Sequence, residues 1–220
     1  MFSTLKKYIS ENLQSEVTNA GLNNYEIFGK EIESPISNLI ELYLNNKNIH
    51  FRSNRAKNKN EFPDLEIIIN DIKYAFEHKA GESGAGPNND MGTLNFYPDK
   101  IEKYGDNIYC VFINYSKANE NNGIVTNFVY FDKIYKFIGK TAAIEGVLKY
   151  RLKDGNLRPK VWSDFSNNTV YFNTLDEFNN AIQKTLQYRA EKLVMQHVNS
   201  LNTEGLERMR NYVDERLRGE

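Results

Sequence analysis

The chain has 220 residues, of which 40% are hydrophobic and 26% are charged, so it can bury the core of one globular domain. Its net charge of −1 excludes a generally polycationic DNA-coating protein, and any contact with DNA must come from local basic patches. The single cysteine, Cys110, excludes an internal disulfide, and no Cys/His cluster has the spacing of zinc ligands.

The sequence begins with MFSTLKKYISENLQ, which lacks the apolar run of a signal peptide. No stretch approaches the length that is needed to span a membrane. We therefore expect a cytoplasmic protein without membrane contacts. Neither an internal repeat nor a Pro/Gly/Ser-rich linker divides the chain, so we expect one domain over residues 1–220.

The first predicted elements are two helices and a strand. Residues 1–22 have helical patterning and are expected to form a peripheral helix. The apolar spacing over residues 32–44 indicates an amphipathic helix, whose first turn tolerates Pro35. A short strand at residues 49–52 and a polar loop at residues 53–62 are expected next.

A β-hairpin is predicted at residues 65–79. The β-rich runs 65–69 and 72–79 are separated only by Asn70-Asp71, a pair typical of two-residue turns. In that register Asp64 faces Glu77, and directly opposed side chains lie about 4.5–5.5 Å apart on one sheet face. The opposite face of the hairpin is apolar and predicts a core layer.

The rest of the chain predicts a second set of strands followed by helices. Its expected elements are a loop at 81–95, a helix at 98–104, strands at 108–115, 127–131 and 169–173, and a helical region from 175 that breaks near 202–205. Together the elements predict an α/β fold with a mixed central β-sheet flanked by helices.

The opposed carboxylates Asp64 and Glu77 suggest a chemical role. Like charges that face each other across a hairpin repel, and a divalent cation between them would remove that repulsion. Oxygen ligands without Cys or His favour Mg²⁺ or Mn²⁺ over Zn²⁺. Lys79 lies on the same face and could hold water or phosphate beside the cation. These are the components of a metal-dependent phosphodiester hydrolase.

Pro63-Asp64, a twelve-residue gap and Glu77-His78-Lys79 resemble the signature of the PD-(D/E)xK nucleases. The resemblance covers about residues 29–131 and implies a restriction-endonuclease-like core, with residues from about 175 to 220 as a helical extension. The chain is most similar to type II restriction endonucleases. These enzymes are typically homodimers that hydrolyse short palindromic sites in double-stranded DNA with Mg²⁺, so the resemblance implies a homodimer whose cuts leave 5′-phosphate and 3′-hydroxyl ends.

The resemblance also implies residue roles. Asp64, Glu77 and the backbone carbonyl of His78 would hold Mg²⁺, which Mn²⁺ can replace, and Lys79 would position or deprotonate the attacking water. The family often adds an acid from the upstream helix, for which Glu31, Glu33 and Glu41 are candidates. We choose Glu33 because it lies about 60° from the centre of the apolar stripe and the other two lie about 140° away.

Three segments are candidates for DNA contact. A basic stretch before Asp64 and a second one after residue 148 could bind phosphates, although both could also be solvated surface. The glycine- and asparagine-rich loop after Lys79 could reach base edges or could be structural. The candidate residues are Arg52, Arg55, Lys57, Lys59, Asn88, Asn89, Asn95, Arg151 and Arg158.

Other prominent residues favour structural roles. His78 and Cys110 alternate with apolar residues and are expected in the core, and Trp162 more often stabilises packing than stacks on a base. The apolar face of the helix from residue 175 could belong to the core or to a dimer contact.

Three alternative functions remain open on sequence grounds. The chain could be a repair or junction-resolving nuclease of the same fold, a DNA-binding module that does not cleave, or an unrelated α/β protein. The intact Asp64, Glu77 and Lys79 set argues against the second alternative. No partner protein other than a second copy of the chain is implied.

Overall fold

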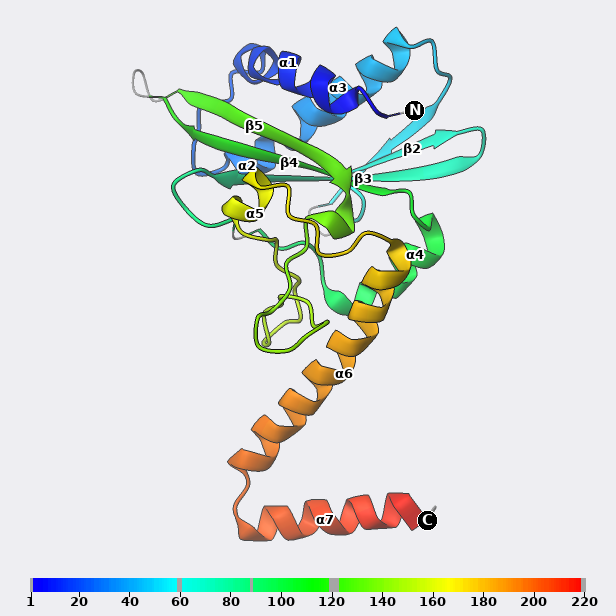
Figure 1. Cartoon of the computed structure of the whole chain (residues 1–220), viewed down its shortest axis with the longest axis vertical. Coiled ribbons are helices and arrows are strands. Elements are labelled where there is room, and N and C mark those ends of the chain that lie inside the picture. The colour runs from blue at the N-terminus through cyan, green and yellow to red at the C-terminus, as the bar shows by residue number, and fades with distance from the viewer. Residues whose placement is uncertain (1, 59–60, 88, 119–122, 219–220) are drawn as a thin grey trace.

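In a computed structural model of the chain, residues 2–58, 61–87, 89–118 and 123–218 are described. A five-stranded sheet lies at the centre, in the order β1-β2-β3-β4-β5 (Figure 1). Only β3 and β4 are parallel, so the sheet is mixed, as predicted. The strands are β1 (Arg52–Arg55), β2 (Leu65–Ile69), β3 (Ile72–Glu82), β4 (Ile108–Lys117) and β5 (Ile124–Lys133).

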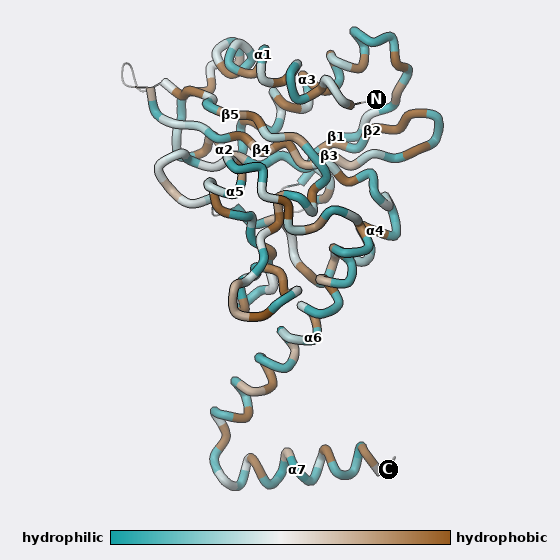
Figure 2. Tube along the Cα trace, in the orientation of Figure 1, coloured by the Kyte–Doolittle hydropathy of each residue, from teal (hydrophilic) through white to brown (hydrophobic). Residues whose placement is uncertain are grey.

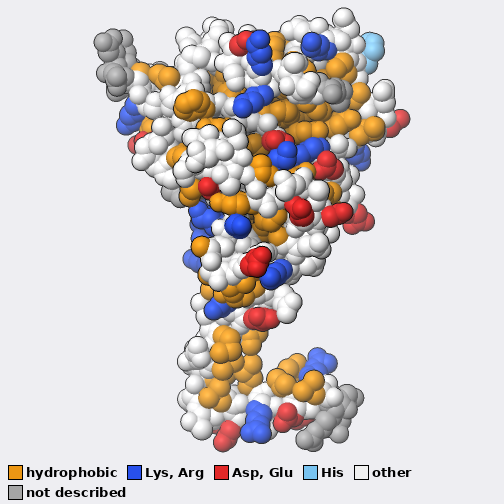
Figure 3. Space-filling model, in the orientation of Figure 1, with side chains coloured by type: hydrophobic (Ala, Val, Ile, Leu, Met, Phe, Trp, Pro, Cys, Tyr) orange, Lys and Arg blue, Asp and Glu red, His pale blue; other side chains and the backbone are white. Residues whose placement is uncertain are grey.

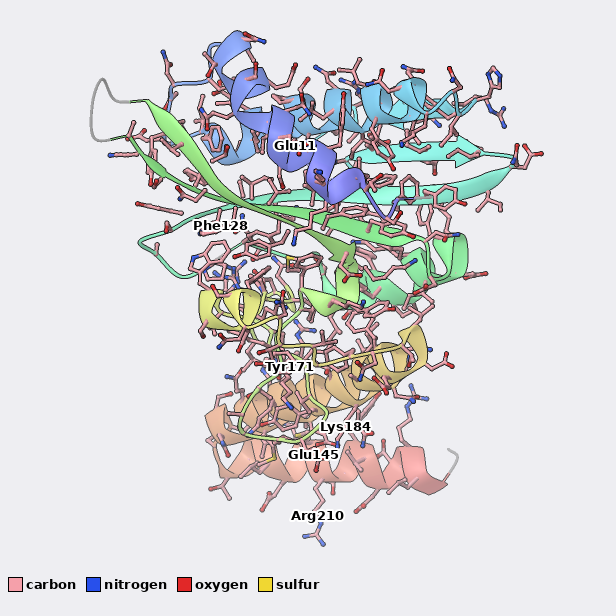
Figure 4. All side chains as sticks on the ribbon, turned by 45° about the horizontal axis from the view of Figure 1, so that its top comes forward. Glu11, Phe128, Glu145, Tyr171, Lys184 and Arg210 are labelled. Atoms are coloured by element: carbon pink, nitrogen blue, oxygen red, sulfur yellow. The ribbon has the colours of Figure 1, made fainter. Side chains whose placement is uncertain are left out.

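Helices cover both faces of the sheet (Figure 1). One face packs against α1 (Leu5–Asn19), α2 (Phe28–Glu31) and α3 (Glu33–Asn46), and the other packs against α4 (Tyr97–Tyr104), α5 (Trp162–Ser166) and the start of α6 (Leu175–Ser200). Short 3₁₀ turns lie at Leu94–Phe96 and Ile134–Lys136. Figure 4 shows Glu11 of α1 on one side of the sheet and Tyr171 and Lys184 on the other.

Each face of the sheet has its own hydrophobic core. Val111 and Ile113 of β4 point into the core under α1 and α3, and Cys110 and Phe112 point into the opposite core. β4 is therefore buried on both faces, which explains its nearly continuous apolar sequence.

The hairpin forms in the predicted register. Asn70 and Asp71 have φ values of 49° and 63°, the left-handed conformation of a two-residue type I′ turn. Ile67 therefore pairs with Tyr74, and Leu65 pairs with Phe76. The apolar side chains between β2 and α3 are buried, as expected, whereas Ile72 at the tip of the hairpin is exposed.

α6 and α7 (Thr203–Arg218) form an arm that extends from the body of the protein (Figure 1). Thr174 begins α6 by accepting a hydrogen bond from the Glu177 backbone N–H, and Glu177 accepts one from the Asn173 N–H in return. Only the first turns of α6 are buried, through Phe178, Ala181, Ile182 and Thr185. The hydropathy trace alternates along α7, as in an amphipathic helix (Figure 2).

Three sequence-based predictions of elements were wrong. The N-terminal helix is not peripheral, because Leu5, Ile9, Leu13 and Val17 are buried in the core against α3 and β5. The predicted strand at 49–52 lies three residues later as β1, since Ile49 and Phe51 pack on the core before pairing with β2 begins. Residues 169–173 form no strand, because there Phe172 packs against Phe178 and the backbone pairs with no neighbouring strand.

No helix in the described ranges is long and apolar enough to cross a membrane.

Candidate active site

Asp64 lies immediately before β2, and its carboxylate contacts the neighbouring strand β3. Asp64 Oδ2 accepts a hydrogen bond of 2.6 Å from the backbone N–H of His78. This bond places the Asp64 carboxylate beside the residue that follows Glu77, although Asp64 itself is outside the strand. The structure thus brings the two predicted acids to one end of the hairpin.

Glu77 and Lys79 project from the same face of β3 and form an ion pair. Lys79 Nζ lies 2.6 Å from Glu77 Oε1, and the two side chains are only 17% and 11% exposed. The second carboxylate oxygen, Glu77 Oε2, is buried and has no hydrogen-bond partner among the described residues. Because buried polar atoms are rarely left without a partner, this oxygen can accept a further ligand.

The predicted catalytic residues share one cleft of about 700 Å³. Glu33 from α3, Asp64 from the position before β2, and Glu77 and Lys79 from β3 all line it. Glu41 does not line it, and its carboxylate instead lies 2.5 Å from Arg55. The remaining lining residues are Glu61, Phe62, Asp90, Gly92, Thr93, Phe96, Asp99, Lys100, Lys103, Tyr104 and Asn156.

Burial and the charges of neighbouring side chains shift the pKa values of the ionisable groups in the cleft. Burial raises the pKa of Glu33 to about 7, and the Asp64 carboxylate adds to this increase. Burial also raises the pKa of Asp64, and the positive charge of Lys79 opposes this increase. For Lys79, burial favours a lower pKa, but Glu77 and Asp64 outweigh it and raise the pKa. The lysine is therefore held protonated between carboxylates.

The two carboxylates fit a hard divalent cation. Within the described ranges, no three His, Cys, Asp or Glu side chains are arranged to hold a metal ion together. Asp64, Glu77 and a backbone oxygen could still bind Mg²⁺, because this ion commonly takes one or two carboxylates and keeps several waters. The unpartnered Glu77 Oε2 is the observation that supports such a site.

Comparison with known proteins decides the family. The NgoBV restriction endonuclease family matches residues 13–218, which is almost the entire chain. The chain belongs to the NgoBV restriction endonuclease family. A solved structure described as NlaIV restriction endonuclease is similar to it with a TM-score of 0.52 and 19% identity, over 82% of this chain and 78% of that chain. No curated protein sequence is significantly similar.

Membership of the NgoBV family confirms that the protein is a restriction endonuclease, an enzyme that cleaves DNA at specific sites. The structural similarity confirms the restriction-endonuclease-like fold that the hairpin signature predicted. The sequence-based alternatives of an unrelated fold or a DNA-binding module without cleavage are therefore set aside.

In this NgoBV-family enzyme the first basic segment lies outside the cleft. Arg52 pairs with Asp71 at 3.3 Å, and Arg55 pairs with Glu41. The exposed residue Lys57 donates its backbone N–H to the Glu61 carboxylate, and none of the three lines the cleft. Lys59 lies outside the described residues.

The second basic segment reaches the cleft through an acid. Arg151 Nη2 and Arg158 Nη1 lie 3.3 and 2.7 Å from the carboxylate of Asp90, which lines the cleft with Asn156. This contact brings residues far apart in the sequence together at the rim of the cleft.

The loop after Lys79 borders the cleft, as predicted. Asp90, Gly92 and Thr93 line it. Asn89 donates its side-chain amide to the Ala80 carbonyl at 2.7 Å, so this donor is engaged within the protein. Asn95 is exposed, and Asn88 lies outside the described residues.

Three residues with predicted structural roles are placed in agreement with those roles. His78 and Cys110 are buried, and burial lowers the pKa of His78 to about 3, so its ring is neutral. Trp162 donates its indole N–H to the carbonyls of Glu82 and Ala85. Its ring also covers Gly81, where a Cβ atom would lie 2.8 Å from Trp162. Trp162 therefore holds the start of the loop.

No sequence pattern predicted one part of the cleft wall. That wall comes from α4, through Lys100, Lys103 and Tyr104, and from Phe62. The polar face of a helix is usually exposed to solvent, so polar residues on α4 are not by themselves a sign of a functional site. Only their proximity in the fold places them beside Asp64 and Glu77.

Proposed function

We propose that this restriction endonuclease hydrolyses both strands of double-stranded DNA at a short palindromic site with Mg²⁺, leaving 5′-phosphate and 3′-hydroxyl ends. The observation that carries the proposal is the shared cleft of Asp64, Glu77, Lys79 and Glu33 in a chain of the NgoBV family. Residues 1–220 act as one endonuclease domain with a core near 29–131 and a helical extension from about 175.

Asp64, Glu77 and the backbone carbonyl of His78 would hold the metal ion, and Mn²⁺ can replace Mg²⁺. When bound, the ion supplies positive charge that stabilises a developing phosphate anion and lowers the pKa of water. Hydrogen-bonding to the His78 N–H orients Asp64, and the ion pair with Lys79 orients Glu77. Both carboxylates are thus held in position before DNA binds.

Lys79 would position the attacking water by donating hydrogen bonds from its ammonium group. Its contact with Glu77 fixes the end of a long side chain that would otherwise be mobile. Glu33 lies in the same cleft and would complete the outer shell of the site, where it can exchange a proton near neutral pH. These roles follow from position and charge.

The candidate DNA contacts differ in their support. Arg151 and Arg158 are placed at the rim through Asp90, so they are suited to bind a phosphate near the cleft. Arg52, Arg55, Lys57 and Lys59 would act farther from the cut, and Asn88, Asn89 and Asn95 would face the DNA from the loop. A cytoplasmic location fits an enzyme whose substrate is intracellular DNA.

A second copy of the chain would supply the second active site. The described residues contain one such cleft with the Asp64, Glu77 and Lys79 set, and a symmetric double-strand cut needs two. Exposed apolar side chains gather inside the angle between α6 and α7 (Figure 3). The exposed large apolar side chains of α6, α7 and the turn between them include Val194, Met195, Leu201, Leu206, Val213 and Leu217.

The exposed charges of α7 also suit pairing with a second copy. Charges of both signs are distributed along it: the acids are Glu204, Glu207, Asp214 and Glu215, and the bases include Arg208, Arg210 and Arg216. Because α7 carries charges of both signs, the charges of two such helices can pair with each other. A second copy of the chain is therefore a suitable partner for the arm.

The decisive experiment is to incubate the full chain with phage or plasmid DNA and Mg²⁺ and to map the fragment ends. Discrete fragments that share one sequence at their ends support site-specific restriction. Cutting of branched DNA alone would instead indicate junction resolution, and retarded but uncut DNA would indicate binding alone. EDTA and the variant Asp64→Asn serve as matched negative controls.

A further inference from the structure

Lys100 is a second lysine whose ammonium group lies in the active-site cleft. It belongs to α4 and lines the cleft with Asp64, Glu77 and Lys79. Its Nζ lies 3.8 Å from the centre of the Phe62 ring and 4.8 Å from the centre of the Tyr97 ring. Aromatic faces hold a cation by their negative quadrupole without neutralising its charge.

Lys100 differs from its neighbouring lysines because it forms no ion pair with a carboxylate within the described part of the chain. Lys79 pairs with Glu77 at 2.6 Å, and Lys103 pairs with Glu66 at 3.4 Å. Burial lowers the pKa of Lys100 to about 8, against the opposing effect of Glu77. A cation in this position is costly unless an anion joins it.

The backbone of the loop that follows Lys79 leaves room for the Lys100 ammonium group at Gly92. Gly92 has a φ of 96°, and a Cβ atom there would lie 2.8 Å from Lys100 Nζ. Glycine adopts this φ without strain, whereas an alanine would be strained and would displace the cation. The loop after Lys79 and the helix α4 therefore together place Lys100.

We propose that Lys100 binds a non-bridging oxygen of the scissile DNA phosphate, an inference that rests on the proposed function of this cleft. Six carboxylate side chains line the cleft and would repel a phosphate, so phosphate binding needs a cation that is not already paired. The charge of Lys79 is compensated by its ion pair with Glu77, so Lys100 is the lysine available to contact the substrate. It stabilises the negative charge that grows on the phosphate in the transition state.

The test compares Lys100→Met with Lys100→Arg and with Lys133→Met as a matched control. Lys133 also lies over an aromatic ring, 4.2 Å from the Tyr109 centre, but it is paired with Asp106 and lies outside the cleft. Lys100→Met removes a partly buried charge that has no carboxylate partner among the described residues, so its thermal stability should equal or exceed that of the wild type.

Two measurements on a duplex with the mapped site decide the outcome. In EDTA, Lys100→Met should reduce the slope of log affinity against log salt by about 1, and Lys100→Arg should keep it. With Mg²⁺, the single-turnover cleavage rate of Lys100→Met should fall roughly 10²-fold. Lys133→Met should leave both values unchanged.

A duplex with a neutral methylphosphonate at the cut position separates direct contact from a positioning effect. Lys100→Met should weaken binding to the normal duplex but not to the neutral one, because the contact is already absent there. Equal weakening on both duplexes, or an unchanged salt slope, would overturn the proposal. If the wild-type protein cuts no DNA, the proposed function itself fails, whatever the Lys100 variants do.

Discussion

The backbone N–H of His78 donates a hydrogen bond of 2.6 Å to Asp64 Oδ2. This bond connects the acid that precedes β2 to the strand that carries Glu77 and Lys79. The main chain of β3, which carries Glu77, therefore orients the Asp64 carboxylate, although Asp64 lies outside the paired strands.

Asp64→Asn should abolish cleavage while the metal-free protein keeps or gains stability. The asparagine carbonyl oxygen can still accept the His78 hydrogen bond, and the substitution removes a carboxylate whose pKa burial raises. Plasmid cleavage with Mg²⁺ and urea unfolding in EDTA measure the two effects. Near-normal cleavage by this variant would refute the role of Asp64.

Glu77→Gln should also abolish cleavage, but it should lower stability by roughly 1–3 kcal/mol, because it weakens a charge-assisted contact. The hairpin register alone predicts relief of repulsion on removal of either acid. The ion pair with Lys79 reverses that expectation for Glu77, since the buried ammonium group would lose its partner.

The double variant Glu77→Gln/Lys79→Met is the control for this reversal. It removes both charges and should recover much of the lost unfolding free energy without recovering cleavage. If Glu77→Gln is as stable as Asp64→Asn in EDTA, the ion pair does not contribute as we infer.

Lys79→Met should bind DNA as the wild type does and should lose cleavage by roughly 10²–10⁴-fold, the usual contribution of a group positioned for proton transfer. Its charge is already shared with Glu77, so its loss changes little in long-range attraction of DNA. Gel retardation in EDTA and single-turnover cleavage separate the two properties. Normal cutting with weak binding would instead identify Lys79 as a phosphate contact.

The hairpin of β2 and β3 could be predicted from the sequence because the rules involved are local. Two turn residues fix the register of β2 and β3, and the register fixes which side chains share a face. Helical periodicity was enough to select Glu33 over Glu41, and Glu33 does line the cleft.

The parts of the site that the sequence did not predict depend on long-range packing. Lys100 shares the cleft with Asp64 only because α4 packs against β3. Asp90 forms an ion pair with Arg158, which is distant in the sequence, and no local sequence pattern predicts such a contact. The burial of α1 was missed for the same reason, since amphipathic spacing gives a helix an apolar face without telling how deeply it is buried.

Glu33→Gln should remove a pH dependence from the stability of the metal-free protein. The pKa of Glu33 is raised from an ordinary value of 4.5 to about 7 in the folded state, so the folded protein holds this proton more tightly. Wild-type stability therefore falls relative to the variant as pH rises from about 4.5 to about 7, and the difference stays constant above that.

Urea unfolding in EDTA at several pH values between 4 and 8 measures this difference. Because Glu33 is only partly buried, we expect the effect to be smaller than that of a fully buried acid. A difference between wild type and Glu33→Gln that does not change with pH would contradict the burial of its carboxyl in the cleft.

The last prediction concerns the dimer. Light scattering of the DNA-free protein should report about twice the chain mass of 25.6 kDa. Leu206 and Val213 are exposed on α7, seven residues apart and thus on one face of the helix. The double variant Leu206→Lys/Val213→Lys should therefore give monomers that remain folded, because neither side chain supports the core of the body.

Asn211→Lys is the matched control, since it adds a lysine about 140–160° away around the same helix. It should stay dimeric and cut both strands. The monomeric double variant should retain the intact cleft with Asp64 and Glu77 but should nick a supercoiled plasmid more readily than it linearises it, because the second active site is no longer held on the same DNA. A wild-type protein that is a monomer both in solution and on cleavable DNA would rule out this arrangement, and a double variant that stays dimeric would place the interface elsewhere.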